Sequence, residues 1–125
     1  MIVIDSDVLI WILRENEAVK TRFTELVIET NGYVFITPIQ VAEIYAGLRE
    51  KEKIKTERFL ESLNIIDIDK EAGKLAGDFI RVCSKSHNVT MADALIGSAA
   101  KLNGFKLWTL NKKHYPMLEA KQFVE

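Results

Sequence analysis

The sequence predicts an α/β fold, a three-layer α/β/α sandwich around a mainly parallel sheet of four to five strands. Short runs rich in β-branched and aromatic residues alternate along the chain with longer segments that have start and stop signals for helices. One or two predicted helices separate each pair of runs, and parallel strands require connections of that kind. At 125 residues, the chain is expected to form one domain spanning 1–125.

Short apolar runs are the predicted strands. The first run, 1–4, is β-branched and stops at Asp5, so that this acid should lie at the carboxyl end of a buried and central strand. The other predicted strands are 33–36, 64–68, 106–110 and, at an edge, 122–124.

Capping residues bound the predicted helices. Thr37-Pro38-Ile39-Gln40 combines a threonine N-cap, proline at the first helical position and glutamine at the third, which predicts a capping box. Asn31-Gly32 and Gly104 tolerate the left-handed conformation that ends a helix. The predicted helices run from Ser6 or Asp7 to about 14, then over 17–30, 38–48, 49–63, 70–86 after Asp69, 91–103 after Thr90, and a short segment that Asn111 caps.

The composition restricts the possible partners. A net charge of −1 lacks the overall positive charge of many nucleic-acid binders, so contacts with phosphates would depend on local basic patches. A single cysteine excludes an internal disulfide and fits a reducing compartment. The first apolar run is interrupted by Asp5 and Asp7, and no segment reaches the length of a membrane span. We therefore expect a cytoplasmic protein with no membrane partner.

Three acids follow strands of the predicted sheet. Asp5 follows the first strand, Glu43 lies in the second turn of the helix after the second strand, and Asp93 lies in the first turn of a later helix. Right-handed connections would bring these positions together at the carboxyl edge of the sheet. Convergent carboxylates repel one another unless a hard divalent ion such as Mg²⁺ or Mn²⁺ joins them. Such an ion can promote phosphodiester hydrolysis.

Each acid also has a structural interpretation. Asp7 and Asp93 lie in first turns of helices, where acids cap N–H groups and offset the helix dipole. Glu43 is harder to explain in this way, because apolar residues on both sides of its helix predict burial on both sides. A buried glutamate is either paired or functional.

The ordered motifs of the chain resemble those of PIN-domain ribonucleases, in particular the short VapC-type toxins of toxin–antitoxin modules. The resemblance covers essentially the whole chain. It rests on four segments: 2–10 with Asp5, 37–49 with Glu43, 93–96 with Asp93, and 107–111 with Thr109 and Asn111.

The resemblance implies a Mg²⁺- or Mn²⁺-dependent endoribonuclease that acts on RNA, forms a homodimer and is inhibited by a small antitoxin protein. Asp5 and Asp93 match the family's metal ligands, and Glu43 matches a third acid that helps to hold the metal or orient water. Many members have a fourth acid after the last core strand, but 109–114 contains none. Asn111 could hold a metal-bound water, Thr109 could bond Asp5 or a phosphate, and Asp7 could replace the missing charge.

Several basic residues and one tryptophan are candidates for contacts with RNA or protein. The basic residues Arg14, Arg49, Lys112 and Lys113 suit an RNA path, although each equally fits an ordinary solvated surface. Trp11 belongs either to the core or to a dimer or antitoxin interface, where tryptophan is enriched.

Two alternative functions remain open. An acid pair after a first strand also begins metal-dependent phosphatases and phosphotransfer domains. However, haloacid dehalogenase-type phosphatases require a glycine-threonine after their aspartates, and response-regulator receivers require adjacent acids; this chain has neither. The missing fourth acid raises a second alternative, a catalytically weakened PIN-like binding module. The presence of Asp5, Glu43 and Asp93 argues against it.

Overall fold

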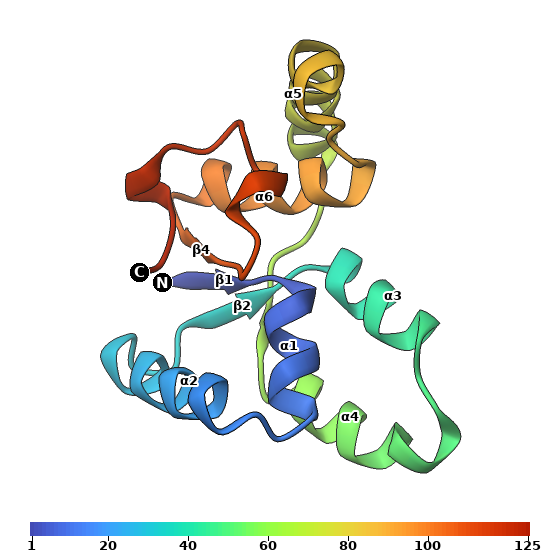
Figure 1. The fold of residues 1–125 in the computed structure, drawn as a ribbon, viewed down its shortest axis with the longest axis vertical. Helices are drawn as coiled ribbons and strands as arrows, with labels where there is room; N and C mark the ends of the chain where they lie inside the picture. The colour runs from blue at the N-terminus through green and yellow to red at the C-terminus, as the bar shows by residue number, and fades with distance from the viewer.

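A parallel four-stranded sheet with strand order β3-β2-β1-β4 forms the centre of the molecule (Figure 1). The computed structural model describes the backbone of residues 1–125 and the side chains of 1–83 and 88–125. The predicted α/β fold is confirmed, and β1 is an inner strand as expected. The strands are β1 (Ile2–Ile4), β2 (Val34–Ile36), β3 (Asn64–Ile65) and β4 (Lys106–Trp108).

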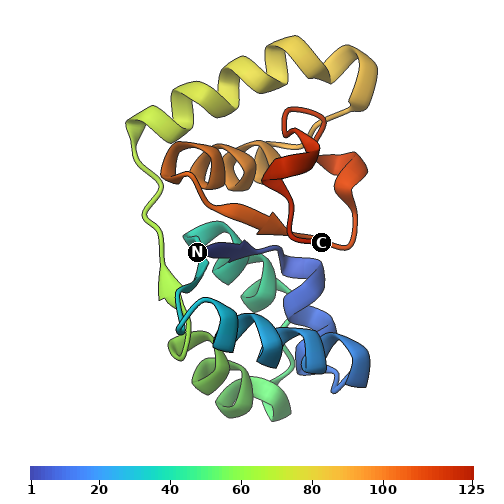
Figure 2. The ribbon, with the colours of Figure 1, turned by 90° about the vertical axis from the view of Figure 1, so that its left-hand side faces the viewer.

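Helices cover both faces of the sheet. Helices α1, α2 and α4 lie on one side, whereas α6 lies on the other with α5 packed on its outer surface (Figure 2). Helix α3 lies between α1 and α6 at the carboxyl edge of the sheet. The helices are α1 (Ser6–Leu13), α2 (Glu17–Glu29), α3 (Pro38–Ala46), α4 (Lys53–Glu61), α5 (Lys70–His87) and α6 (Met91–Asn103), with the 3₁₀ turns η1 (Glu50–Glu52), η2 (Lys112–His114) and η3 (Ala120–Gln122).

The alternation of side chains along β1 divides the core between the two faces. Ile2 and Ile4 pack with the helices of one layer, while Val3 packs with Ile96 of α6 and Leu107 of β4 in the other. This is the two-residue period of a strand. Because β1 is buried on both faces, its sequence is an uninterrupted apolar run.

Several predicted boundaries differ from the observed ones. Strand β3 has only two residues instead of 64–68, although Ile66 N still donates a hydrogen bond to Ile36 O at 2.8 Å. The predicted strand 122–124 forms one isolated bridge, between Phe123 and Leu107, and not a regular strand. Both segments lie at edges of the sheet, where strand pairing is available on one side only.

The prediction that helix α3 is buried on both sides was wrong. Gln40 and Ile44 are its buried residues, whereas Ala42, Tyr45 and Ala46 are exposed. The helix contacts α1, α6 and β2, and Ile39 in its first turn packs against the core. The rest of its second apolar side, at Ala42 and Ala46, is exposed.

The capping box at Thr37 is confirmed and links α3 to the central strand. Thr37 Oγ1 accepts a hydrogen bond from Ile39 N at 3.1 Å, and Gln40 Oε1 accepts one from Thr37 N at 3.0 Å. The other end of the Gln40 amide, Nε2, donates to Ile4 O at 3.0 Å. This bond joins the first turn of α3 to the end of β1, just before Asp5.

The predicted N-cap of α1 was wrong by one or two residues. Neither Ser6 nor Asp7 caps the helix; Asp5 does, because its Oδ1 accepts a hydrogen bond from Ser6 N at 2.8 Å. The predicted caps Asp69 and Thr90 are confirmed, since they accept hydrogen bonds from Ala72 N and Asp93 N. Among the described residues, no helix is both long and apolar enough to cross a membrane.

We expect Gln40→Leu to destabilise the protein by about 1–3 kcal/mol, because it leaves the buried Ile4 carbonyl without its side-chain donor. Urea denaturation followed by circular dichroism measures this change. Gln122→Leu, at the half-buried end of η3, is the control and should change stability less. Equal stability of wild type and Gln40→Leu would contradict the role given to this bond.

Candidate active site

Four carboxylates gather where chain leaves the carboxyl edge of the sheet. Asp5 directly follows β1, Asp7 lies in the first turn of α1, Glu43 lies in α3, and Asp93 lies in the first turn of α6. Strand β1 lies between β2 and β4 in the sheet. Helix α1, which follows β1, and helix α6, which precedes β4, cover opposite faces of the sheet. In open α/β sheets, the point where successive connections change from one face to the other forms the crevice where ligands bind.

Thr109, which follows β4, joins the two aspartates of the first segment. Its Oγ1 donates to Asp5 Oδ2 at 2.8 Å and lies 3.4 Å from Asp7 Oδ2. Asp7 Oδ2 also accepts a hydrogen bond from Leu110 N at 3.2 Å, and Asn111 N donates to Thr109 Oγ1 at 3.1 Å. The predicted bond between Thr109 and Asp5 is therefore present, and Asp7 binds the chain after β4.

Glu43 lies beside Ser6, at the start of α1. Ser6 Oγ donates to Glu43 Oε1 at 2.6 Å, and Glu43 remains partly exposed to solvent. The sequence predicts a glutamate enclosed on both sides, whereas the structure leaves Glu43 open on one side.

Asp93 is held by residues that follow β4. Tyr115 OH donates to Asp93 Oδ1 at 3.4 Å, and His114 Nδ1 lies 3.6 Å from Asp93 Oδ2. The other ring nitrogen of His114 lies 2.9 Å from Asn111 Nδ2. The prediction that Asn111 caps a short helix is confirmed for its position, since Asn111 is the N-cap residue of η2. Its side-chain amide contacts the imidazole and makes no hydrogen bond to the turn.

Burial and mutual repulsion change the acidity of these groups. Burial, partly offset by the hydrogen bond from Thr109, raises the pKa of Asp5, and the neighbouring Asp93 raises it further. Burial and the charge of Asp5 raise the pKa of Asp7 to about 6. The pKa of Glu43 is raised by burial and by Asp5 and Asp93. Burial and the same charges raise the pKa of the Tyr115 phenol, which therefore remains a hydrogen-bond donor.

The set of donors fits a hard divalent cation, although the side chains do not form a finished cage. No lysine or arginine among the described side chains forms an ion pair with Asp5, Asp7, Glu43 or Asp93. Carboxylate oxygens are the ligands that Mg²⁺ and Mn²⁺ prefer. Within the described part of the chain, no three His, Cys, Asp or Glu side chains close on one point that could hold a metal. Hydrogen bonds from Ser6, Thr109 and Tyr115 hold the carboxylates individually.

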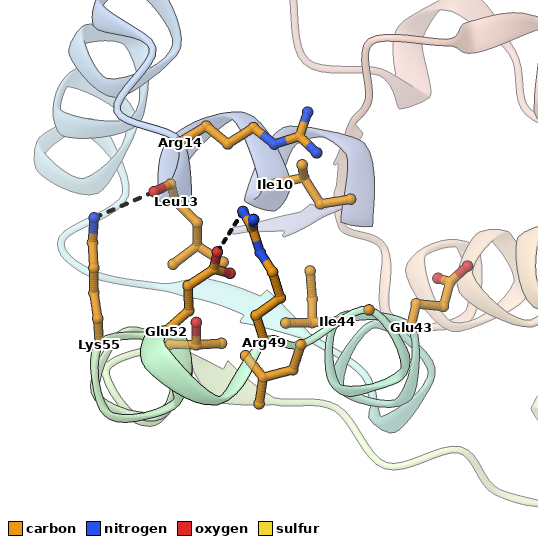
Figure 3. A pocket seen from close by; sticks show the side chains of 11 residues that line it. Ile10, Leu13, Arg14, Glu43, Ile44, Arg49, Glu52 and Lys55 are labelled. Atoms are coloured by element: carbon orange, nitrogen blue, oxygen red, sulfur yellow. Dashed lines mark hydrogen bonds and ion pairs between the residues drawn. The ribbon is translucent and has the colours of Figure 1, made fainter.

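A groove of about 730 Å³ opens beside Glu43, between α1, α3, η1 and α4 (Figure 3). Arg14 and Arg49, two of the predicted RNA-contacting residues, line it. Arg49 forms an ion pair with Glu52 at 2.7 Å. Lys112 and Lys113 lie elsewhere, on the exposed turn η2 next to His114. The four predicted basic residues therefore form two separate groups near the carboxylates.

Three residues that contact the acids were not among the predicted site residues. Ser6 stands between two aspartates and is predicted only as a helix cap, whereas Tyr115 and His114 lie in the irregular segment after β4. The sequence of that segment has no regular hydrophobic period that would indicate which side chains face the site. The polar and aromatic residues that directly follow the last core strand are the one feature that could have indicated them.

The metal-free protein should be more stable at pH 5 than at pH 7.5. The ordinary pKa of the Asp7 side chain is 3.8, and below this pH Asp7 is protonated in both the folded and the unfolded protein. As the pH rises through the folded-state pKa of about 6, the folded protein must give up a proton that the unfolded protein has already lost, which lowers the stability. Asp7→Asn removes the contribution of Asp7 to this loss and so reduces the difference between the two pH values. Urea denaturation in EDTA at both pH values measures it.

The matched control for this experiment is Asp67→Asn, which alters an exposed aspartate outside the site. It should keep the wild-type difference between pH 5 and pH 7.5. If Asp7→Asn also keeps that difference unchanged, then the buried Asp7 carboxylate does not contribute as described.

The comparisons with known proteins agree with this geometry. The family model of the PIN domain matches residues 2–117. The chain is 34% identical over 120 residues to ribonuclease VapC10 of Mycobacterium tuberculosis, covering 95% of this chain and 89% of that protein.

Solved structures with the same fold support this similarity. A toxin-antitoxin complex from Klebsiella pneumoniae is similar with a TM-score of 0.78 at 19% identity, over 100% of this chain and 97% of the other. FitAcB from Neisseria gonorrhoeae is similar with a TM-score of 0.72 at 26% identity, over 92% and 91%. The chain belongs to the PIN-domain family.

Proposed function

We propose that the chain, as one nuclease domain over 1–125, is a Mg²⁺- or Mn²⁺-dependent endoribonuclease and the toxin of a toxin–antitoxin module. The observation that supports it most is the group of Asp5, Asp7, Glu43 and Asp93 at one edge of the sheet, with raised pKa values for three of them. Similarity to a ribonuclease named VapC10 supports RNA as the substrate.

Each acid has a proposed role. Asp5 and Asp93 bind the divalent ion with help from Glu43, and the ion supplies Lewis-acid chemistry for phosphodiester hydrolysis. Glu43 also orients the attacking water and accepts its proton, for which a raised pKa is suitable. Asp7 provides the fourth carboxylate from α1. Thr109 and Asn111 support the site, the first by its bond to Asp5 and the second by its contact with His114.

The proposed partners are RNA, a small antitoxin protein and a second copy of this chain, in the cytoplasm. The similar structure from Klebsiella pneumoniae is a toxin–antitoxin complex, which supports a partner of that kind. Trp11 is 42% exposed, with the Arg14 guanidinium 5.8 Å from its ring centroid. An exposed indole of this kind suits a protein interface better than solvent.

Asp5→Asn and Asp93→Asn should abolish RNA cleavage while the fold is retained. Loss of proton transfer in Glu43→Gln should slow cleavage on the order of 10²–10⁴-fold. The assay incubates purified protein with a mixture of labelled RNAs and Mg²⁺, Mn²⁺ or EDTA, and circular dichroism monitors the fold. Asp67→Asn is the control.

The assay also separates the alternatives. Cleavage by wild type in EDTA, or full activity of Asp5→Asn, would contradict the proposed site. RNA binding without cleavage under all metal conditions would favour the weakened binding module instead.

The basic residues should contribute separately to RNA affinity. Binding is measured in the Asp5→Asn variant, which should not cleave the RNA. In this background we expect the double change Arg14→Ala with Arg49→Ala to weaken RNA binding. It should also reduce the slope of log affinity against log salt concentration by about 0.7 for each lost phosphate contact. Changing Lys112 and Lys113 to Ala tests the second group in the same way. Fluorescence anisotropy of a labelled RNA measures both.

Lys74→Ala serves as the control for this series, because Lys74 lies on the exposed surface of α5. Its salt dependence should equal that of the background protein. A pair of basic residues whose loss leaves the slope unchanged does not contact the RNA backbone.

A further inference from the structure

We propose that Tyr115 is a positioning residue for Asp93: its buried hydroxyl donates a hydrogen bond to this carboxylate and fixes its orientation. This inference rests on the proposed function, because it assigns Tyr115 a role toward the same divalent ion. Tyr115 belongs to neither the predicted ligands nor the predicted supporting residues.

The fold holds the Tyr115 ring rigidly. The residue follows η2 and is 1% exposed, packed with Ile96, Leu107 and Phe123. A Cβ atom added to Gly97 would lie 3.4 Å from Tyr115 Cδ1. The ring therefore packs closely against α6 at Gly97. Gly97 stands four residues after Asp93, so the ring lies on the helical face that carries this acid.

The hydroxyl of Tyr115 donates a hydrogen bond to Asp93 Oδ1 at 3.4 Å. A buried hydroxyl requires an acceptor, and the Asp93 carboxylate provides one. Tyr115 follows β4 whereas Asp93 belongs to α6, so this bond fixes the carboxylate relative to a second element. In agreement with a hydroxyl close to the site, a hydrogen bond from Tyr115 also partly offsets the raised pKa of Asp5.

The other contacts of Asp93 leave this task to Tyr115. Thr109 and Ser6 N bind Asp5 and not Asp93. His114 lies 3.6 Å from Asp93, but its side chain is 57% exposed, whereas Tyr115 is buried. The phenol of Tyr115 is neutral, so it restrains the carboxylate without adding a charge. Hydrogen-bond partners that orient metal ligands typically contribute about 10–100-fold to metal affinity.

Tyr115→Phe tests the inference, because it removes the hydroxyl and keeps the ring that packs on Gly97. We expect Mn²⁺ to bind about 10–100-fold more weakly to the variant, measured from the electron paramagnetic resonance signal of unbound Mn²⁺. Cleavage should recover at high Mn²⁺, with the KM for RNA unchanged. Tyr33→Phe, which alters an exposed tyrosine, is the control and should bind Mn²⁺ like the wild type.

The outcomes separate this inference from the proposed function. If the wild type binds Mn²⁺ and cleaves RNA while Tyr115→Phe binds Mn²⁺ equally tightly, the positioning role is wrong and the proposed function stands. If the wild type binds no Mn²⁺, the proposed metal site fails and the inference fails with it. Lower activity of Tyr115→Phe that excess Mn²⁺ does not restore would also overturn the positioning role.

A second measurement on the unaltered sequence does not depend on the stability of the variant. Protein labelled with 3-fluorotyrosine has three fluorine resonances, from Tyr33, Tyr45 and Tyr115. Titration with Mg²⁺ should shift the Tyr115 resonance and leave those of the two exposed tyrosines in place. A Tyr115 resonance that stays unchanged while Mg²⁺ binds would overturn the inference.

Discussion

The buried carboxylate of Asp5 at the end of β1 is the constraint on which the site depends. A charge in this position is unfavourable because burial removes it from water, and the neighbouring Asp93 adds repulsion. Ser6 N and Thr109 Oγ1 each donate a hydrogen bond to it. These bonds offset part of the cost. No lysine or arginine among the described side chains pairs with the cluster, so it carries uncompensated negative charge that a positive ligand would stabilise.

The scaffold brings the acids together through bonds between elements that are distant in sequence. Gln40 joins α3 to the end of β1, and so places Glu43 beside Ser6. Thr109 joins the end of β4 to Asp5, and Tyr115 joins the segment after β4 to Asp93. Each connecting residue is buried, and their side chains are fixed by packing. Precise placement of a reactive group requires such support, because small displacements of catalytic groups reduce rates strongly.

Much of this arrangement follows from local sequence patterns. The Thr37 capping box, the stop at Gly104 and the β-branched run before Asp5 are local signals, and the structure contains all three features. Features that depend on neighbours far along the chain were not predictable in the same way. The open side of α3 depends on which helices pack beside it, and the contact of Tyr115 depends on how the segment after β4 packs against α6 near Gly97. The edge strand β3 was also predicted too long, because it pairs only with β2 and its hydrogen bonds stop where β2 ends.

We propose that the carboxylates of Asp5 and Asp93 hold a divalent ion at the carboxyl edge of the sheet. Crystals soaked in Mn²⁺, with data collected near the manganese absorption edge, would locate such an ion. We expect an anomalous difference peak in contact with oxygens of both Asp5 and Asp93, and the loss of this peak in Asp5→Asn. Mn²⁺ bound only elsewhere on the protein, or an unchanged peak in Asp5→Asn, would show that these two carboxylates do not hold the ion.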